Sequence, residues 1–434
     1  MARFLFTVWP FVGHVYNQVA IAQALRARGH EVAFYTGRDM EPVLRGEGFA
    51  VFPFRHIDAA KLRESILPQE QASSAGWWTP GLWLRIARDW LYGTVPDQVA
   101  DLEPIIDSWG PDVLVTDVTM WAPILVLWES TGIPTAVSST MMGCPFPGPD
   151  VRPWIPWMPR TLANGLKRAT DFAAALAGSP GRRRIDALRA ARGLPSMGYS
   201  AEAFAMRLPL YLVPSIPALD FKRRDLPASV QYTGDCSWNK PSKEPPAGWL
   251  DSLPPDRLVV HVSEGTAHHQ EPFLLRAAAA GLGGAPVEVV MTTGSNRHPG
   301  ELGLAPLAPN VRVVRWVSHQ ELLPRCAAVV TTGGAGTILA ALRQGLPLVV
   351  VPTHWDKSDN ARRVVEAGAG LRLDAARCNP RTLRAAVLRV LHDESFRHQA
   401  ERMSRLLGDA VGPPGAAALL ESLIRRPRAL TQTA

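Results

Sequence analysis

The sequence predicts an α/β protein with two doubly wound domains, each built on a parallel sheet with helices on both faces. Three observations support this fold class. The chain has 434 residues, which is too long for one ordinary hydrophobic core. Strand-like apolar runs alternate with helix-like runs near the N-terminus and again in the C-terminal half. Hydrophobic residues make up 47% of the chain and charged residues 20%, which is typical of a well-buried globular protein.

The first domain, residues 1–212, opens with a strand, a loop, a helix and a second strand. These are predicted in order by the runs RFLFTVW, PFVGHVYN, QVAIAQALRARG and HEVAFYT, with Gly29 closing the helix. The alternation of helix and strand recurs in EPIIDSWG, PDVLVTD, APILVLWESTG and IPTAVSS. From about Val151 to Gly198 the chain is rich in Trp, Pro and Arg, which indicates loops and helices lying over the sheet.

Residues 213–245 are predicted to be a linker, because the chain there becomes polar and proline-rich. In the second domain, residues 246–411, strands are predicted by five runs: RLVVHVSEGT, VEVVMTTG, VRVVRWV, AAVVTTGG and LPLVVVP. The GPPG at 412–415 interrupts the helical tail. The segment 412–434 is expected to form a last short helix that packs back on the N-terminal domain.

Composition narrows the choice of partners. The net charge of +7 is a mild excess, and its clusters are scattered, so no nucleic-acid footprint is predicted. The four cysteines, which have no metal-ligand spacing, favour a reducing compartment. The apolar N-terminus is interpreted as a strand rather than a signal peptide, and no apolar run is long enough to span a bilayer. A cytoplasmic location is therefore expected, and a homodimer is left open.

Several polar residues fall where predicted strands end, which is where open α/β sheets bind ligands. The stretch TTGGAGT (331–337) leads from a strand into a helix, whose first N–H groups can bind an anion. No Gly-Lys-Ser/Thr follows, so a P-loop is excluded. The other polar strand ends are His14, Asp117, Ser263 to Thr266, Trp316 to His319, and His354 to Asp356.

Three motifs in order resemble the family 1 glycosyltransferases, and bacterial natural-product enzymes of that family most of all. They are FTVWPFVGHVYNQVAIAQALRARGHEVAFYTG, VLVTDVTMWAP, and the long stretch from WVSHQELLPRC to NARRVVEAGAG. The resemblance covers essentially the whole chain. It implies the GT-B fold and an inverting, metal-independent transfer of sugar from a nucleotide-diphosphate sugar, which is a co-substrate rather than a cofactor. The acceptor it implies is a hydrophobic small molecule.

The resemblance also implies roles for two residues of the N-terminal domain. His14 matches the general base that takes the proton of the acceptor hydroxyl, and an imidazole suits this role because its pKa lies near neutrality. Asp117 matches the acid that orients that imidazole. A loop histidine that caps a helix and an aspartate N-cap are the structural alternatives.

Further residues match the family's donor site. Trp316 would stack on the nucleobase, His319 would contact the base or ribose, and Asp356 would bind sugar hydroxyls. Hydroxyls of Ser263 and Thr266 would face the phosphates and sugar. The diphosphate would be held by the loop and helix start that include Thr332, Gly334, Gly336 and Thr337. A helix N-terminus suits a leaving group that gains negative charge.

Three positions depart from the family pattern. Thr332 replaces the usual histidine, so the grip on the diphosphate is expected to differ. Lys357 replaces the usual sugar-reading glutamine and could reach an anionic group. Ala340 replaces the glutamate that grips the ribose hydroxyls in UDP-dependent members, which favours a dTDP-sugar over a UDP-sugar.

The acceptor site is predicted from tryptophans in the N-terminal half, chiefly Trp77, Trp78, Trp83 and Trp121, which could wall an apolar pocket. Core packing is the alternative. The segment Val151–Arg168, which mixes Trp with Arg and Lys, could instead give weak membrane association. Two other functions stay open beside sugar transfer: a GT-B sugar-nucleotide epimerase, and a non-catalytic partner that binds sugar nucleotides.

Overall fold

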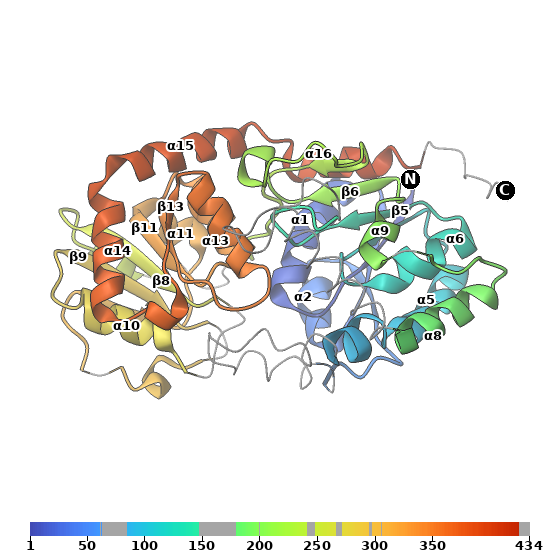
Figure 1. The fold of residues 1–434 in the computed structure, drawn as a ribbon, viewed down its shortest axis with the longest axis horizontal. Coiled ribbons are helices and arrows are strands. Elements are labelled where there is room, and N and C mark those ends of the chain that lie inside the picture. The colour runs from blue at the N-terminus through green and yellow to red at the C-terminus, as the bar shows by residue number, and fades with distance from the viewer. Residues whose placement is uncertain are drawn as a thin grey trace, which may run out of the picture.

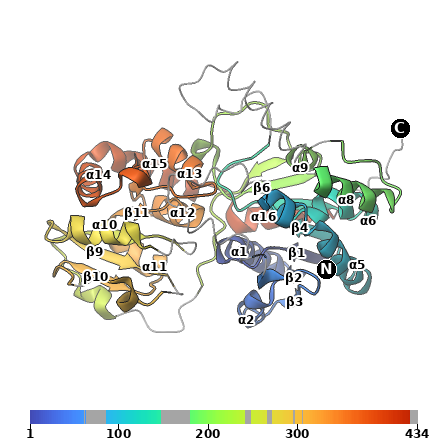
Figure 2. The same cartoon turned by 60° about the horizontal axis from the view of Figure 1, so that its bottom comes forward.

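The structure is a computed structural model of the chain, and it consists of two lobes that lie side by side (Figures 1 and 2). Each lobe holds one parallel β-sheet flanked by helices, which confirms the predicted α/β class with two doubly wound sheets. The structure describes residues 1–60, 62, 85–146, 179–198, 200–240, 248–265, 271–294, 297–304 and 306–424.

The N-terminal lobe contains a seven-stranded sheet in the order β3-β2-β1-β4-β5-β6-β7, with all neighbours parallel. Leu5 packs in one apolar cluster, whereas Phe4 and Phe6 pack in another. Because successive strand residues point to opposite faces, both faces of the sheet are buried. The strands are β1 (Arg3–Thr7), β2 (Glu31–Thr36), β3 (Ala50–Pro53), β4 (Val113–Thr116), β5 (Thr135–Ser138), β6 (Leu210–Val213) and β7 (Val230–Tyr232).

The helices of this lobe alternate with the strands along the chain. The described α-helices are α1 (Val12–Ala27), α2 (Glu41–Gly46), α5 (Val95–Trp109), α6 (Trp128–Thr131), α8 (Ser179–Ala190) and α9 (Ala201–Ala205). Two π-helical segments, η2 (Ile86–Leu91) and η3 (Pro123–Leu127), and two 3-10 turns, η1 (Arg38–Met40) and η4 (Pro217–Leu219), complete the described elements.

The C-terminal lobe contains a six-stranded sheet in the order β10-β9-β8-β11-β12-β13, again with all neighbours parallel. Its strands are β8 (Leu258–Ser263), β9 (Val287–Thr292), β10 (Val311–Val314), β11 (Cys326–Thr331), β12 (Leu348–Val350) and β13 (Gly370–Arg372). Its α-helices are α10 (Phe273–Leu282), α11 (His319–Leu322), α12 (Ala335–Arg343), α13 (Lys357–Glu366), α14 (Pro380–His392) and α15 (Glu394–Gly408). Short 3-10 turns are η5 (Gly248–Ser252), η6 (Pro299–Leu302), η7 (Leu323–Arg325) and η8 (Ala375–Arg377).

The five strands predicted in the C-terminal half are confirmed, but three local expectations change. The segment predicted as a loop after β1 is helical from Val12, and the N–H of His14 closes the first turn on the Phe11 carbonyl at 2.9 Å. The predicted linker carries β7, which pairs with β6 as the last strand of the first sheet. β13 is an additional edge strand. The sequence does not predict β3 or β6 either, and all four of these strands have only three or four residues, so their pairing depends on tertiary context.

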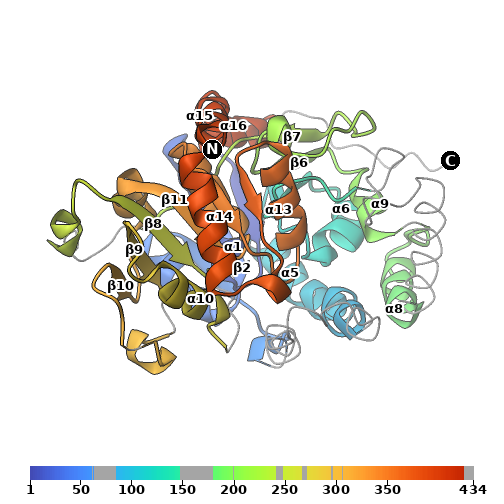
Figure 3. The same cartoon turned by 60° about the vertical axis from the view of Figure 1, so that its left-hand side comes forward.

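The chain crosses between the lobes a second time near its C-terminal end. α15 lies on the C-terminal lobe, and the last described helix, α16 (Gly412–Glu421), lies beside α1 on the N-terminal lobe (Figures 1 and 3). Leu420 of α16 and Leu423 are buried in the same cluster as Phe4 and Val19. Glu421 also pairs with His30 at 2.6 Å. The last helix is therefore part of the N-terminal core.

The order of strands fixes where ligands can bind. In each sheet the chain reverses its winding direction between two neighbouring strands, β1 and β4 in the first sheet and β8 and β11 in the second. Ligands of open α/β sheets bind outside the carboxyl ends of the strands at this point. Among helices formed by the described residues, none is long and apolar enough to cross a membrane.

Candidate active site

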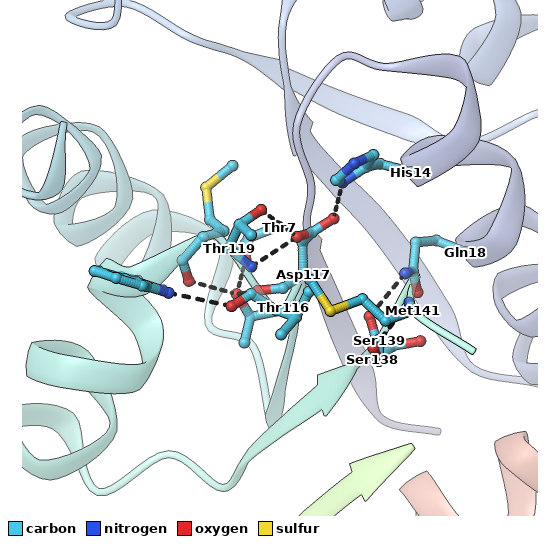
Figure 4. A network of polar contacts seen from close by, with 12 residues as sticks. Thr7, His14, Gln18, Thr116, Asp117, Thr119, Ser138, Ser139 and Met141 are labelled. Atoms are coloured by element: carbon cyan, nitrogen blue, oxygen red, sulfur yellow. Dashed lines mark hydrogen bonds and ion pairs between the residues drawn. The ribbon is translucent and has the colours of Figure 1, made fainter. Parts of the chain in front are cut away.

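His14 and Asp117 meet at the point where the first sheet reverses its winding. His14 lies in the first turn of α1, after β1, and Asp117 directly follows β4. His14 Nδ1 lies 2.5 Å from Asp117 Oδ2, and the ring points toward the carboxylate in Figure 4. With Nδ1–H donated to the carboxylate, the free lone pair of a neutral ring is on Nε2. The imidazole is 25% exposed, so a ligand can reach it.

The Asp117 carboxylate is held rigidly. Its side chain is fully buried, and Oδ1 accepts hydrogen bonds from the N–H of Thr119 at 2.8 Å and from the Thr119 hydroxyl at 2.7 Å. The Asp117 N–H in turn donates to the Thr7 carbonyl of β1 at 2.9 Å. Asp117 thus organises the turn after β4 and also binds the imidazole, but it does not cap a helix, because the next helical residue is Trp121.

The contact between His14 and Asp117 shifts the pKa of both side chains. Burial opposes a charged imidazole, but the Asp117 carboxylate, its hydrogen bond and the charge of Asp356 outweigh burial and raise the pKa of His14 above 6.5. Burial would raise the pKa of Asp117, yet the imidazole and the Thr119 donors lower it overall. An imidazole with a raised pKa beside a fixed carboxylate is suited to accepting a proton.

The stretch TTGGAGT forms the turn from β11 into α12, as the sequence predicts. Gly334 is the N-cap, and no side chain caps this helix start. Gly336 is exposed, and Thr337 is half-buried. The first N–H groups of α12 are therefore open to an anionic ligand, and the helix dipole favours negative charge there.

Gly333 has a backbone conformation that only glycine adopts readily, with φ +98°. A Cβ at this position would lie 3.0 Å from the Lys357 carbonyl oxygen and 3.2 Å from Val350 Cγ1. We expect Gly333→Ala to lower the free energy of unfolding by about 1–3 kcal/mol and to weaken nucleotide binding. Urea denaturation and calorimetric titration measure the two effects.

Gly336→Ala is the matched control, because Gly336 lies in the first turn of the same helix and a Cβ there meets only Ser237 Oγ, at 4.0 Å. Alanine should leave the free energy of unfolding unchanged or raise it at this position. Equal destabilisation by both substitutions would contradict the assigned strain at Gly333.

Two buried side chains connect this turn to α13. Asn360 is fully buried, and its Nδ2 donates to the Gly333 carbonyl at 3.0 Å and to Asp356 Oδ2 at 2.9 Å. Lys357 Nζ donates to the Thr353 hydroxyl at 3.1 Å and to the Thr332 hydroxyl at 3.4 Å. Sequence reasoning missed Asn360, although its spacing four residues after Asp356 places both on one helix face.

Thr332 and its neighbour Glu264 have structural partners. The Thr332 hydroxyl donates its proton to the Glu264 carbonyl at 2.9 Å, so this proton is not available to a ligand in this arrangement. The Glu264 carboxylate, 2% exposed, pairs with Arg297 at 2.8 Å and accepts from Leu274 N–H at the start of α10. Ser263 Oγ accepts from Gly265 N–H at 3.2 Å. Sequence reasoning missed Glu264, because its partner lies in a distant segment.

Trp316 and His319 lie after β10, on the same edge of the second sheet. Trp316 is half exposed, at 50%, so its ring is available for stacking. His319 is partly buried, and burial lowers its pKa. It packs edge-on against the ring of His261 with centroids 5.8 Å apart. Thr266, predicted to face the phosphates, lies outside the described residues.

Ser237 connects the two halves of the candidate site. Its hydroxyl donates to Asn17 Oδ1 at 3.3 Å, one turn of α1 beyond His14. The same hydroxyl is close to Gly336 at the start of α12. The charge of Asp356, from the C-terminal lobe, also raises the pKa of His14 in the N-terminal lobe. The polar residues of both sheets therefore face one region between the lobes.

The tryptophans predicted for an acceptor pocket do not gather at this region in the described part of the chain. Trp77, Trp78 and Trp83 lie outside the described residues, as does Val151–Arg168. Trp121 is buried, and its indole N–H donates to the Val118 carbonyl at 3.1 Å, which fits core packing.

A chain of other aromatic rings begins at the imidazole instead. Phe11 packs edge-on against His14 at 5.4 Å, and Trp90 packs against both Phe11 and Trp355. Trp355 has φ +61°, an uncommon conformation for a bulky residue that is found most often at functional sites. Trp90 is one of the N-terminal tryptophans on which the acceptor prediction rested, whereas sequence reasoning missed the rings of Phe11 and Trp355, because each comes from a different segment.

Comparisons with known proteins identify relatives of this chain. Residues 278–423 match the family model described as Erythromycin biosynthesis protein CIII-like, C-terminal domain. The chain is 35% identical over 414 residues to 4'-demethylrebeccamycin synthase of Lentzea aerocolonigenes, covering 93% of this chain and 94% of the relative.

Two solved structures share the fold. The structure of the glycotransferase of kitacinnamycin aligns with a TM-score of 0.74 at 24% identity, covering 98% of this chain and 99% of that one. The glycosyltransferase SsfS6 of Streptomyces sp. SF2575, complexed with thymidine diphosphate, aligns with a TM-score of 0.68 at 22% identity, covering 97% and 100%.

Proposed function

Because this chain belongs to the family 1 glycosyltransferases of bacterial natural-product pathways, with the GT-B fold, we propose that it transfers a sugar with inversion and uses His14 as the general base. Its relatives support a sugar-nucleotide-dependent glycosyltransferase rather than an epimerase or a non-catalytic partner. The acceptor we propose is a hydroxyl of a hydrophobic small molecule.

The observation that carries the proposal is the contact between His14 and Asp117 beside the open start of α12. The acceptor hydroxyl would give its proton to His14 Nε2 while its oxygen bonds to the anomeric carbon. The bond from that carbon to the diphosphate breaks, and the diphosphate takes the electron pair. One in-line displacement of this kind inverts the configuration of the sugar.

The leaving group would be stabilised by the protein itself. The N–H groups of Gly334 to Thr337 and the helix dipole would receive the charge that develops on the diphosphate. Lys357 adds a positive charge next to the same turn. We therefore propose that turnover needs no metal ion, and that it persists in excess EDTA.

For the donor we propose a dTDP-sugar. Ala340, half-buried on α12, offers no carboxylate to a ribose 2′-hydroxyl. One fold neighbour, SsfS6, was solved in complex with thymidine diphosphate, which is consistent with this preference. Calorimetric titration with dTDP and UDP in EDTA tests it, and dTDP should bind more tightly.

Ala340→Glu is the complementary variant. A carboxylate that accepts hydrogen bonds from ribose hydroxyls should improve UDP binding by about tenfold, while dTDP binding changes less. Tighter binding of UDP to the unmodified protein would overturn the donor assignment. Binding of neither nucleotide would overturn the donor site.

A further inference from the structure

A buried ion pair joins the two lobes away from His14. Arg363 Nε lies 3.1 Å from Asp220 Oδ1, and the two side chains are only 9% and 3% exposed. Asp220 directly follows η4, after the sixth strand of the N-terminal sheet, whereas Arg363 lies on α13 of the C-terminal lobe. Burying two charges costs solvation free energy, so the pair is stable only when further hydrogen bonds and contacts stabilise both groups.

The N-terminal lobe satisfies the Asp220 carboxylate. Oδ2 accepts a hydrogen bond from the Cys144 N–H at 3.1 Å and another from the Tyr232 hydroxyl at 2.7 Å. The Arg363 guanidinium lies 4.4 Å from the centre of the Phe221 ring, a favourable stacking contact for arginine. The pair is therefore anchored to the loop after β5, to the segment after β6 and to β7.

Apolar contacts strengthen the same joint. Met142, Ile216 and Leu219 belong to the N-terminal half of the chain, yet they are buried in the apolar cluster that contains α12 and α13 residues. A Cβ on Gly143 would collide with the Arg363 guanidinium, so the loop after β5 carries a glycine where it passes the ion pair.

The other end of α13 holds the groups of the candidate donor site. Arg363 Nη1 donates to Asn360 Oδ1 at 3.4 Å. The Asn360 amide nitrogen binds both the Asp356 carboxylate and the Gly333 carbonyl. The ten-residue helix α13 is thus fixed to the N-terminal lobe near the C-terminal end of the helix. Near its start, the same helix supports the turn from β11 into α12, where the diphosphate is proposed to bind.

We propose that Asp220 and Arg363 are positioning residues that set the placement of the sugar donor relative to His14. The proposal rests on the function proposed above and deepens it. Neither residue needs to touch a substrate, because the pair acts through α13. A misplacement of reacting groups by about 1 Å can lower turnover by about 10²-fold, so a small displacement of α13 would suffice.

The test uses Arg363→Gln with Arg397→Gln as the matched control. Arg397 lies on α15 of the same lobe, where it pairs with Glu401 and is 45% exposed. We measure calorimetric binding of dTDP and UDP, the turnover number for transfer, and the interatomic distance distribution by small-angle X-ray scattering. We expect Arg363→Gln to keep nucleotide affinity within about threefold and to lower turnover by about 10²-fold. The interatomic distance distribution of Arg363→Gln should be broader than that of the unmodified protein. Arg397→Gln should match the unmodified protein in all three measurements.

Arg363→Lys distinguishes placement from general packing. It keeps the charge but loses the planar contact, so it should recover part of the lost turnover. The proposal would be overturned if Arg363→Gln lowered the turnover number by less than about threefold, or if its interatomic distance distribution were identical to that of Arg397→Gln. If Arg363→Gln does not fold, Asp220→Asn and Arg363→Lys are measured by the same criteria. If the unmodified protein transfers no sugar, the proposed function fails, whereas scattering still decides whether the pair holds the lobes.

Discussion

His14→Ala should lower turnover by about 10²–10⁴-fold, the usual contribution of a general base. The imidazole contacts Asp117 and faces the region between the lobes, whereas the predicted nucleotide-binding residues lie on the other sheet. Binding of dTDP should therefore change by less than about threefold. Steady-state transfer to a hydrophobic acceptor and calorimetric titration measure the two quantities.

His30→Ala is the control for this variant. His30 follows the other end of α1 and pairs with the Glu421 carboxylate at 2.6 Å, so it is also a histidine beside an acid. Its loss should leave turnover unchanged, because the pair lies at the opposite end of the helix. Turnover in His14→Ala close to that of the unmodified protein would rule out His14 as the base.

Asp117→Asn should lower turnover by about 10²–10⁴-fold and also shift its pH dependence. The base must be neutral to accept a proton, so activity falls as the pH falls through the raised pKa of His14. Without the carboxylate, burial dominates and favours the neutral ring. The acid limb of the profile should then move to lower pH even though the maximum rate is smaller.

The pH–rate profile therefore separates two roles of Asp117. A carboxylate that only shaped the turn after β4 would change the rate or the stability but would leave the acid limb in place. An unchanged acid limb in Asp117→Asn, with an intact fold by circular dichroism, would contradict the electrostatic role.

Sequence patterns predicted the sheets well, because strands buried on both faces leave continuous apolar runs such as RLVVHVS and AAVVTT. They also located polar residues at strand ends. Patterns could not show that β1 lies beside β4, which brings His14 to Asp117 across 103 positions. That adjacency came from the resemblance to a family and not from the residues themselves.

Most of the residues that were missed have partners that are distant in the chain, Asn360 with its partner Asp356 being the exception. Glu264 reads as part of a hydroxyl-bearing loop, but its carboxylate binds Arg297. The Asp220 partner of Arg363 is 143 positions away. Composition likewise directed the acceptor prediction to clustered tryptophans, whereas the ring that packs against His14 is Phe11, with Trp90 packed between Phe11 and Trp355. Single residues of ordinary type carry no local signal of such contacts.

The return of α16 to the N-terminal lobe limits how this protein can be recombined with its relatives. A chimera that joins the first half of one enzyme to the second half of another, with one exchange point between the sheets, takes α16 from the wrong parent. Leu420 and Leu423 would then have to fit an apolar surface formed by α1 and β1 of a different sequence. A second exchange point between Gly408 and Gly412 keeps α16 with the sheet that it covers. Donor exchange by chimeras should therefore use two junctions, and single-junction chimeras should express as less stable proteins.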